Sequence, residues 1–382
     1  MIQESTLVDL GGSPEISLRE KLEAIRIDML EEYRMDHGYP WIIGLSGGKD
    51  STLVLHLVFE MILRIPPSER TRSLHVVAND TGVESPLVIG HLERLLEKLR
   101  AAARAMEVPM TVTKTMPRPN DTFWVNLIGR GYPSPNRSFR WCTDRLKIQP
   151  TSVYIRQLSE QAGQSILLLG VRRSESAKRA VSARKFDNGQ RLNKHNDLAG
   201  CLVYRPILEL TTEEVWTYLL QSRAPWGGTH RDLIALYRTA NSGECPLVID
   251  ADTAPSCGTG SSRFGCWTCT VVTKDKSLEG FVEAGYPEFE PLLDFREWLA
   301  QIRNDTTLRQ AVRRSGATTF QADGSLIPGP FTMSTRQEIL SRLTSLQQAM
   351  AIPLISDIEI ELIKEIWAAD MLVPSVLEGA RA

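Results

Sequence analysis

The stretch IIGLSGGKDSTLVLHLV, residues 42–58, constrains the fold more than any other part of this sequence. It places glycines, serines, a lysine and an aspartate between a strand-like apolar run and a helix-like run. Backbone N–H groups of a Gly-rich turn that leads from a strand into a helix form a nest for phosphate. Glycine suits such a turn because a Cβ atom would block close approach and because some positions require φ > 0. The stretch therefore predicts an α/β fold with a phosphate-binding loop.

Strand-like and helix-like segments alternate through the first half of the chain. The expected strands are WIIGL, SLHVVAND, MTVTKTM and SILLLGV, and amphipathic helices are expected at 17–37, 86–106 and 147–160. This alternation predicts a Rossmann-like parallel sheet with helices on both faces. We expect three regions: an α/β domain over 1–240, a Cys-rich cluster loop over 241–290 and a helical C-terminal region over 291–382.

Composition excludes several functional classes. A formal net charge of −2 means that any contact with nucleic acid must come from a local basic patch. No apolar run approaches the roughly 18–20 residues that span a bilayer, so no membrane partner is expected. The N-terminal residues lack a basic start followed by an apolar stretch, which favours the cytoplasm. Because that compartment is reducing, the six cysteines are not expected to form disulfides.

The SGGKDS loop is not the mononucleotide P-loop, since Ile43 and Asp50 stand where that motif requires Gly and Ser/Thr. It resembles the PP-loop of the N-type ATP pyrophosphatases, which have the adenine nucleotide α-hydrolase fold. The alternative is an ordinary Gly-rich turn between a strand and a helix. The resemblance implies that ATP and Mg²⁺ bind here, with Lys49 neutralising the pyrophosphate and Asp50 helping to hold Mg²⁺. It also implies that the pyrophosphate is cradled by Ser46, Gly47, Gly48 and Ser51.

Three further motifs follow expected strands or precede an expected helix. They are NDTGVES (79–85), FRWCTDRLK (139–147) and GVRRSESAKR (170–179), and together with the loop they resemble the phosphoadenylyl-sulfate (PAPS) reductase branch of the family. Loops at the carboxyl ends of parallel strands form the ligand-binding edge of such sheets. The resemblance adds Asp80, Gly170 and Arg172 to the ATP site. The alternative for the basic side chains is a solvated surface. Candidate contacts to phosphate or DNA are Arg140, Arg145, Lys147, Arg173, Lys178 and Arg179.

Cys142 is flanked by basic residues, including Arg140 and Lys147. Nearby cations lower the pKa of a thiol and favour the thiolate, which accepts or attacks sulfur. We therefore expect Cys142 to carry a persulfide, the alternative being a buried structural cysteine, whereas Cys201 is expected to belong to the core. The predicted catalytic residues are Lys49, Asp50, Cys142 and Arg172.

Four other cysteines crowd into one Gly/Ser-rich region: Cys245, Cys257, Cys266 and Cys269. The last two have C-x-x-C spacing, which indicates tetrahedral ligation of a metal. Zinc and a [4Fe–4S] cluster both accept four thiolates, and spacing alone does not separate them. A structural zinc site usually pairs two C-x-x-C units, so the single unit favours iron–sulfur.

The segments CPLVID, PSCG, SRFGCWTC and TVVTKDKS resemble the DNA phosphorothioation sulfurtransferases of the DndC and SspD type. In that family the four cysteines hold a [4Fe–4S] cluster. ATP chemistry prepares a DNA backbone oxygen for replacement by sulfur. The resemblance implies a cysteine desulfurase as sulfur donor, other phosphorothioation proteins as partners, and a homodimer.

Three rival functions are separable. PAPS and APS reductases share the core but use a redox cysteine near the C-terminus, whereas the last cysteine here is Cys269. A tRNA thiolase applies the same adenylation logic to a base, but no RNA-binding module is recognisable. The non-catalytic alternative is a nucleotide-regulated scaffold with a structural zinc. The presence of Lys49 in the loop and of the cation-flanked Cys142 argues against it.

Overall fold

A computed structural model describes residues 16–175, 189–240 and 264–372 of the chain. A six-stranded sheet has the order β3-β2-β1-β4-β6-β5, and every neighbouring pair is parallel except β5 with β6. The strands are β1 Trp41–Gly44, β2 Leu74–Asn79, β3 Met110–Thr115, β4 Ser165–Leu168, β5 Leu192–Lys194 and β6 Cys201–Tyr204. The predicted Rossmann-like α/β fold is confirmed.

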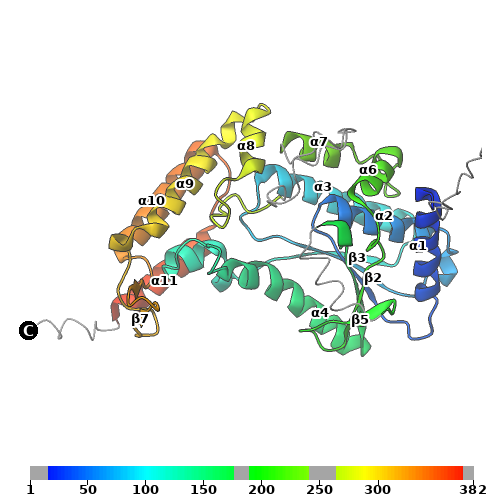
Figure 1. Ribbon diagram of the computed structural model, residues 1–382, viewed down its shortest axis with the longest axis horizontal. Helices are drawn as coiled ribbons and strands as arrows, with labels where there is room; N and C mark the ends of the chain where they lie inside the picture. The colour runs from blue at the N-terminus through cyan, green and yellow to red at the C-terminus, as the bar shows by residue number, and fades with distance from the viewer. Residues whose placement is uncertain (1–15, 176–188, 241–263, 373–382) are drawn as a thin grey trace, which may run out of the picture.

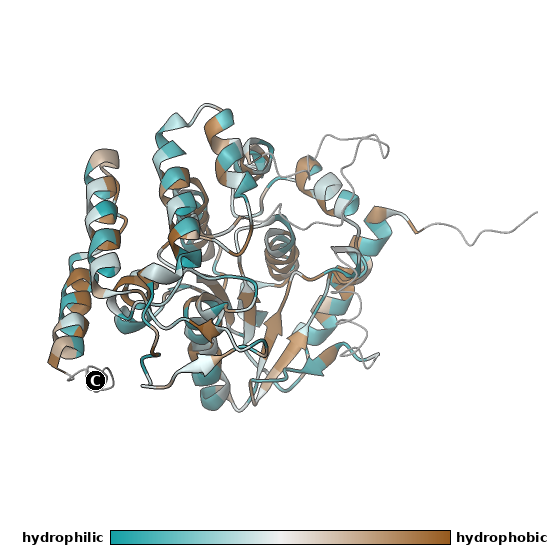
Figure 2. Cartoon of the chain, turned by 60° about the vertical axis from the view of Figure 1, so that its left-hand side comes forward, coloured by the Kyte–Doolittle hydropathy of each residue, from teal (hydrophilic) through white to brown (hydrophobic). Residues whose placement is uncertain are grey.

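Helices cover both faces of this sheet. The larger core cluster packs α1, α2, α3, α6 and α7 against one face, and a smaller cluster packs α4 against the other. Their bounds are α1 Leu18–Tyr33, α2 Lys49–Leu63, α3 Pro86–Ala105, α4 Gln149–Ala162, α6 Thr212–Gln221 and α7 Arg231–Thr239. Figure 2 shows largely hydrophobic strands between helices whose colouring is two-sided, as burial of one helix face requires.

The order of the strands reverses between β1 and β4. The chain runs outward from β1 through β2 to β3, then crosses by α4 to β4 on the other side of β1. Ligands of open α/β sheets bind at such a switch point, outside the carboxyl ends of the strands. The glycine loop follows β1 and the Gly170–Arg172 segment follows β4, so the topology brings these two motifs together.

The C-terminal part of the described chain is mainly helical, as predicted, with one short hairpin. Its helices lie at the end of the molecule away from α1 (Figure 1). The elements are α8 Lys276–Glu283, α9 Glu290–Asn304, β7 Thr319–Phe320, β8 Leu326–Ile327, α10 Met333–Met350 and α11 Asp357–Leu372. Within the described ranges, none of the helices combines the length and apolarity needed to cross a bilayer.

A second core joins these helices to the middle of the chain. It contains Trp124, Trp267, Phe295 and Ile363 among its buried side chains. The indole N–H of Trp124 donates to Leu354 O at 2.6 Å, and that of Trp367 donates to Ile128 O at 3.0 Å. Residues on both sides of the expected boundaries near 240 and 290 thus pack into one cluster. The three regions themselves stay a prediction.

Candidate functional site

The glycine loop connects β1 to α2 by a turn that closes on itself. Ser46 N–H donates to Ser51 Oγ at 3.2 Å, and the Ser51 hydroxyl donates to Gly48 O at 3.1 Å. Gly47 has φ +76°, in the left-handed region that favours glycine. Gly48 is the N-cap residue of α2 and has no side chain with which to cap the helix. The loop therefore presents the N-terminal amides of α2 in the way an anion site requires.

Tyr237 on α7 is a loop contact that the sequence motifs did not indicate. Its hydroxyl accepts a hydrogen bond from Lys49 N–H at 3.2 Å, and its ring lies 5.6 Å from Lys49 Nζ. A Cβ on Gly48 would lie 3.1 Å from the same hydroxyl. Tyr237 thus packs directly against the glycine loop, residues 46–51, which we also call the nucleotide loop. An amphipathic helix residue far along the chain carries no local signal of this contact.

Three charged side chains, those of Lys49, Asp50 and Arg172, meet next to the glycine loop. Asp50 Oδ1 accepts from Arg172 Nε at 2.6 Å, and Asp50 Oδ2 lies 3.4 Å from Lys49 Nζ. Lys49 is 4% exposed and Arg172 is fully buried. Arg172 Nη1 also donates to Ser174 and Thr212, whereas its Nη2 has no hydrogen-bond partner within the described part of the chain. Arg172 therefore anchors Asp50 and keeps one donor group for an oxyanion.

Gly170 is required by packing. A Cβ at this position would lie 2.7 Å from the carbonyl group of Asp50 and from Ser51 N. The segment after β4 therefore runs directly against the first turn of α2. This close approach lets the buried guanidinium of Arg172 reach the carboxylate of Asp50.

Asp80, at the end of β2, is 6% exposed and already partnered. Its carboxylate accepts from Gly82 N–H at 2.8 Å and from Lys114 Nζ at 3.1 Å. The predicted role of Asp80 in binding ATP stays a prediction. In this structure its carboxylate shapes the turn that leads to Glu84.

The C-x-x-C turn docks on that same turn. Cys266 forms an isolated antiparallel bridge with Glu84, and Trp267 N–H donates to Val83 O at 3.0 Å. On its other side, Arg296 Nε donates to Cys269 O at 3.0 Å. The Cys266 and Cys269 thiols are thus held at the edge of the sheet from which the nucleotide loop also emerges. The rings of Tyr237 and Phe264, whose centroids lie 4.7 Å apart, connect the two places.

Cys142 lies near Cys269 and Lys147, whose charges act on its thiol. Burial raises the pKa of its thiol, the neighbouring Cys269 sulfur raises it further, and Lys147 lowers it less. The expectation that flanking cations favour the thiolate is therefore wrong for the metal-free protein, because desolvation outweighs them. Burial also raises the pKa of Cys266, and Glu84 adds to that effect. The charge of Cys266 in turn raises the pKa of Lys147. We call Cys142, Cys266 and Cys269 the thiol site.

The predicted metal ligands are only partly visible. Cys245 and Cys257 lie outside the described residues, as do Lys178 and Arg179. Among the residues that the structure describes, no group of three or more His, Cys, Asp or Glu side chains is arranged to hold a metal ion. The donor chemistry of the C-x-x-C pair nevertheless fits a thiolate-ligated metal, because two partly buried thiols share a fixed turn with the cation of Lys147 nearby.

The remaining basic residues that we predicted to contact phosphate or DNA do not lie together. Arg140 is exposed, near Cys142 in sequence. Arg145 pairs with Asp121 at 2.6 Å, and Arg173 pairs with Glu209 at 2.8 Å. Cys201 is buried in β6, which confirms its assignment to the core. The structure thus gathers Lys147 at the thiol site and leaves Arg140 on the surface, while Arg145 and Arg173 form ion pairs.

Comparison with known proteins identifies one family. Residues 40–272 match the family described as phosphoadenosine phosphosulfate reductase domain. An uncharacterized protein of Methanocaldococcus jannaschii is 27% identical over 187 residues, which cover 49% of this chain and 32% of that protein. The chain therefore spans about a third of the length of this curated relative.

Solved structures are more distant. A phosphoadenylyl-sulfate reductase from Candida auris in a phosphate complex has 12% identity and a TM-score of 0.31, covering 55% of this chain and 89% of that one. The U34-tRNA thiolase NcsA from Methanococcus maripaludis with its [4Fe-4S] cluster has 14% identity and a TM-score of 0.34, covering 74% and 80%.

Proposed function

The chain belongs to the phosphoadenosine phosphosulfate reductase domain family, and on that premise we propose that it is an ATP-dependent sulfurtransferase that introduces sulfur into the DNA backbone. One observation carries the proposal. A nucleotide loop with buried Lys49 and Arg172 shares a sheet edge with the thiol site. Activation by ATP and delivery of sulfur need these two kinds of site side by side.

The first step is adenylylation of a DNA phosphate. A non-bridging oxygen attacks the α-phosphorus of ATP, the bond to the bridging oxygen breaks, and pyrophosphate leaves. The α2 amides and the Lys49 ammonium stabilise the charge that develops on the leaving group. We assign the Nη2 group of Arg172, which has no hydrogen-bond partner among the described residues, as a further donor to the pyrophosphate.

Mg²⁺ enters this step with ATP. Both carboxylate oxygens of Asp50 already face cations, Arg172 at 2.6 Å and Lys49 at 3.4 Å. In this arrangement Asp50 orients both cations, and its predicted role in holding Mg²⁺ stays a prediction.

The second step replaces AMP by sulfur. A persulfide on Cys142, charged by a cysteine desulfurase, provides a terminal sulfur that bonds to phosphorus as the bond to AMP breaks. Cleavage of the remaining S–S bond releases the phosphorothioate and consumes two electrons from a thiol reductant. Lys147, beside the thiol site, stabilises the persulfide anion.

A [4Fe–4S] cluster would be held by Cys266 and Cys269 together with Cys245 and Cys257. When bound, the cluster would supply thiophilic iron next to Cys142. The Cys266–Cys269 turn is fixed by Glu84, Val83 and Arg296, so its two thiols are oriented before any metal binds. DNA, other phosphorothioation proteins and a second copy of the chain are the proposed partners, with Arg140, Arg145, Lys147 and Arg173 as candidate contacts to DNA.

Reduction of an adenylyl sulfate is the second candidate, because the family match by itself favours it. In that reaction the adenylyl group arrives with the substrate, so ATP is not cleaved. The two candidates therefore differ in a measurable product, pyrophosphate.

The test is release of pyrophosphate from ATP by anaerobically prepared protein with its sulfur donor, offered DNA, tRNA or adenylyl sulfate in turn. DNA-dependent release, with sulfur appearing in the backbone, is the expected result. Release with tRNA alone would make the chain a tRNA thiolase. Formation of sulfite from adenylyl sulfate without pyrophosphate would make it a reductase.

A further inference from the structure

A small pocket lies between α2, α3 and α7, beside the nucleotide loop. Its polar lining comes from Thr52, His91, Arg94, Lys98, Thr229, His230 and Asp232. Thr52 is in the first turn of α2, and Leu92, next to His91 on α3, lies 3.5 Å from the Cβ position of Gly47. The pocket therefore adjoins the loop but is lined by other side chains.

Two polar atoms in this pocket lack a partner. Thr52 is 2% exposed, yet its Oγ1 makes no hydrogen bond with any described residue, and the same holds for Nε2 of His91. Buried polar groups in native proteins are nearly always hydrogen-bonded, because an unmade bond costs about 1–3 kcal/mol. Two such atoms around one pocket indicate a polar ligand.

The charge of the lining favours an anion. Arg94 and Lys98 lie one helical turn apart on α3, and Asp232, 3.7 Å from Lys98, is the acidic residue of the lining. Burial lowers the pKa of His91 and lowers that of His230 to about 4, so both rings are neutral at pH 7. The side chains therefore leave a net positive charge at the pocket.

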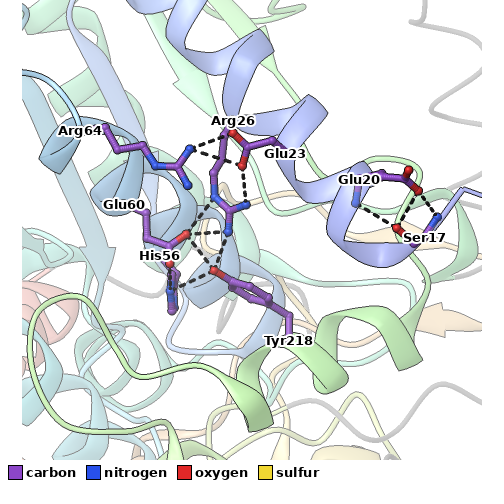
Figure 3. Close-up of polar contacts among 8 residues, drawn as sticks. All are labelled: Ser17, Glu20, Glu23, Arg26, His56, Glu60, Arg64 and Tyr218. Atoms are coloured by element: carbon purple, nitrogen blue, oxygen red, sulfur yellow. Dashed lines mark hydrogen bonds and ion pairs between the residues drawn. The ribbon is translucent and has the colours of Figure 1, made fainter.

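The wall around His230 is rigid. His230 Nε2 lies 3.0 Å from His56 Nδ1, and His56 Nε2 lies 3.1 Å from Glu60. Figure 3 shows Glu60 held in turn by Arg26 and Tyr218, each at 2.8 Å. This network reaches from α1 to the pocket. It fixes the His230 ring without using Thr52 or His91.

We propose that this pocket binds a small inorganic oxyanion of the phosphate type, separately from the nucleotide. Hydrogen phosphate offers oxygen acceptors for the Thr52 hydroxyl and for the cations of Arg94 and Lys98. It also has one O–H group, so it can pair with His91 Nε2 in either tautomer of that ring. A halide has no donor and leaves the acceptor tautomer of His91 unpaired.

The test is calorimetric titration of the full-length protein with inorganic phosphate after saturation with AMPCPP, an ATP analogue resistant to cleavage at the α–β bridge. The nucleotide loop is then occupied, and we expect phosphate to bind still. Thr52→Val and Arg94→Gln should each weaken phosphate binding roughly tenfold or more, because each removes one hydrogen bond to a charged ligand. Thr52→Ser keeps the hydroxyl and should bind as the wild type does.

Arg104→Gln is the matched control, since Arg104 is exposed on the same helix and outside the lining. An equal loss in this variant would mean that surface charge alone attracts phosphate, and would overturn the proposal. So would binding of AMPCPP without any binding of phosphate. A failure of AMPCPP to bind would count against the nucleotide site instead, and the difference between Thr52→Val and Thr52→Ser would still decide the pocket.

Discussion

The nucleotide loop takes its residues from one short run, Ser46–Ser51, whereas the thiol site joins Cys142 to a turn from a distant segment. In the loop, the single carboxylate of Asp50 lies between two cations, Lys49 and Arg172, and leaves a net positive charge for an anion. In the thiol site, burial instead raises the pKa values of the Cys142 and Cys266 thiols.

This difference separates a preformed site from an incomplete one. Both cations of the loop face the Asp50 carboxylate, which holds them in place before an anion binds. Thiols with raised pKa values are protonated at neutral pH, and they become thiolates when a metal or a transferred sulfur supplies the missing stabilisation. The predictions below test whether the two sites are independent in this way.

The largest effect is expected for Lys49→Ala. Loss of the ammonium that faces the leaving pyrophosphate should slow ATP cleavage by about 10²–10³-fold, as loss of one preorganised donor does in other active sites. Iron content should be unchanged, because the contacts of Lys49 within the described residues are with Asp50 and Tyr237 rather than with the thiol site. Lys21→Ala, which breaks a surface pair with Glu214, is the control and should cleave ATP normally. Normal turnover in Lys49→Ala would refute the assignment of the loop.

Replacing Cys266 and Cys269 together by Ser should remove nearly all bound iron from anaerobically purified protein, measured by iron assay and by visible absorbance. A hydroxyl is a far weaker ligand for iron than a thiolate. Cys201→Ser changes a buried thiol in β6 and should keep its iron. If the double variant held as much iron as the wild type, the C-x-x-C pair would not be a ligand pair.

Arg172→Gln should lower the free energy of unfolding by about 3 kcal/mol in urea denaturation, because it leaves the Asp50 carboxylate without its main buried partner. Its neighbour provides the control. Arg173 pairs with Glu209 on the surface, and Arg173→Gln should cost about 0.5 kcal/mol or less. Similar losses of unfolding free energy in the two variants would show that the buried pair of Arg172 and Asp50 contributes no more than the surface pair of Arg173 and Glu209.

The smallest effect is expected for Thr52→Val. In phosphate-free buffer this change should raise the free energy of unfolding by about 1 kcal/mol, because it removes a buried hydroxyl without a partner while keeping the shape of the side chain. The same urea experiment measures it. A clear destabilisation would mean that the hydroxyl is satisfied in the apo protein, and would weaken the case for a ligand in that pocket.

Several features of the site follow from sequence patterns. The phosphate loop is recognisable because its residues are contiguous and its backbone requirements, such as φ +76° at Gly47, select glycine. The parallel sheet is predictable because apolar strands alternate with amphipathic helices. The secondary structure predicted from the sequence was correct for α1, β1, β2, α3, β3 and β4.

Other features depend on distant contacts. The protonation of Cys142 was predicted with the wrong sign because its charged sequence neighbours are visible in the sequence and its burial is not. The contact between Tyr237 and Lys49 joins α7 to α2 and has no local pattern. The role of Gly170 depends on the approach of its backbone to Asp50 at a crossing of two segments.

By itself, the sequence determined the chemical types: a glycine loop for phosphates, a C-x-x-C pair for a thiophilic ligand, and strands that form a parallel sheet. Only the tertiary structure decided how these groups are paired. It placed Asp50 between two cations, brought Cys142 to the C-x-x-C turn and left Thr52 Oγ1 and His91 Nε2 without a hydrogen-bond partner among the described residues. The physical reason is that phosphate-loop geometry depends on consecutive backbone angles, whereas desolvation and charge pairing depend on neighbours in space.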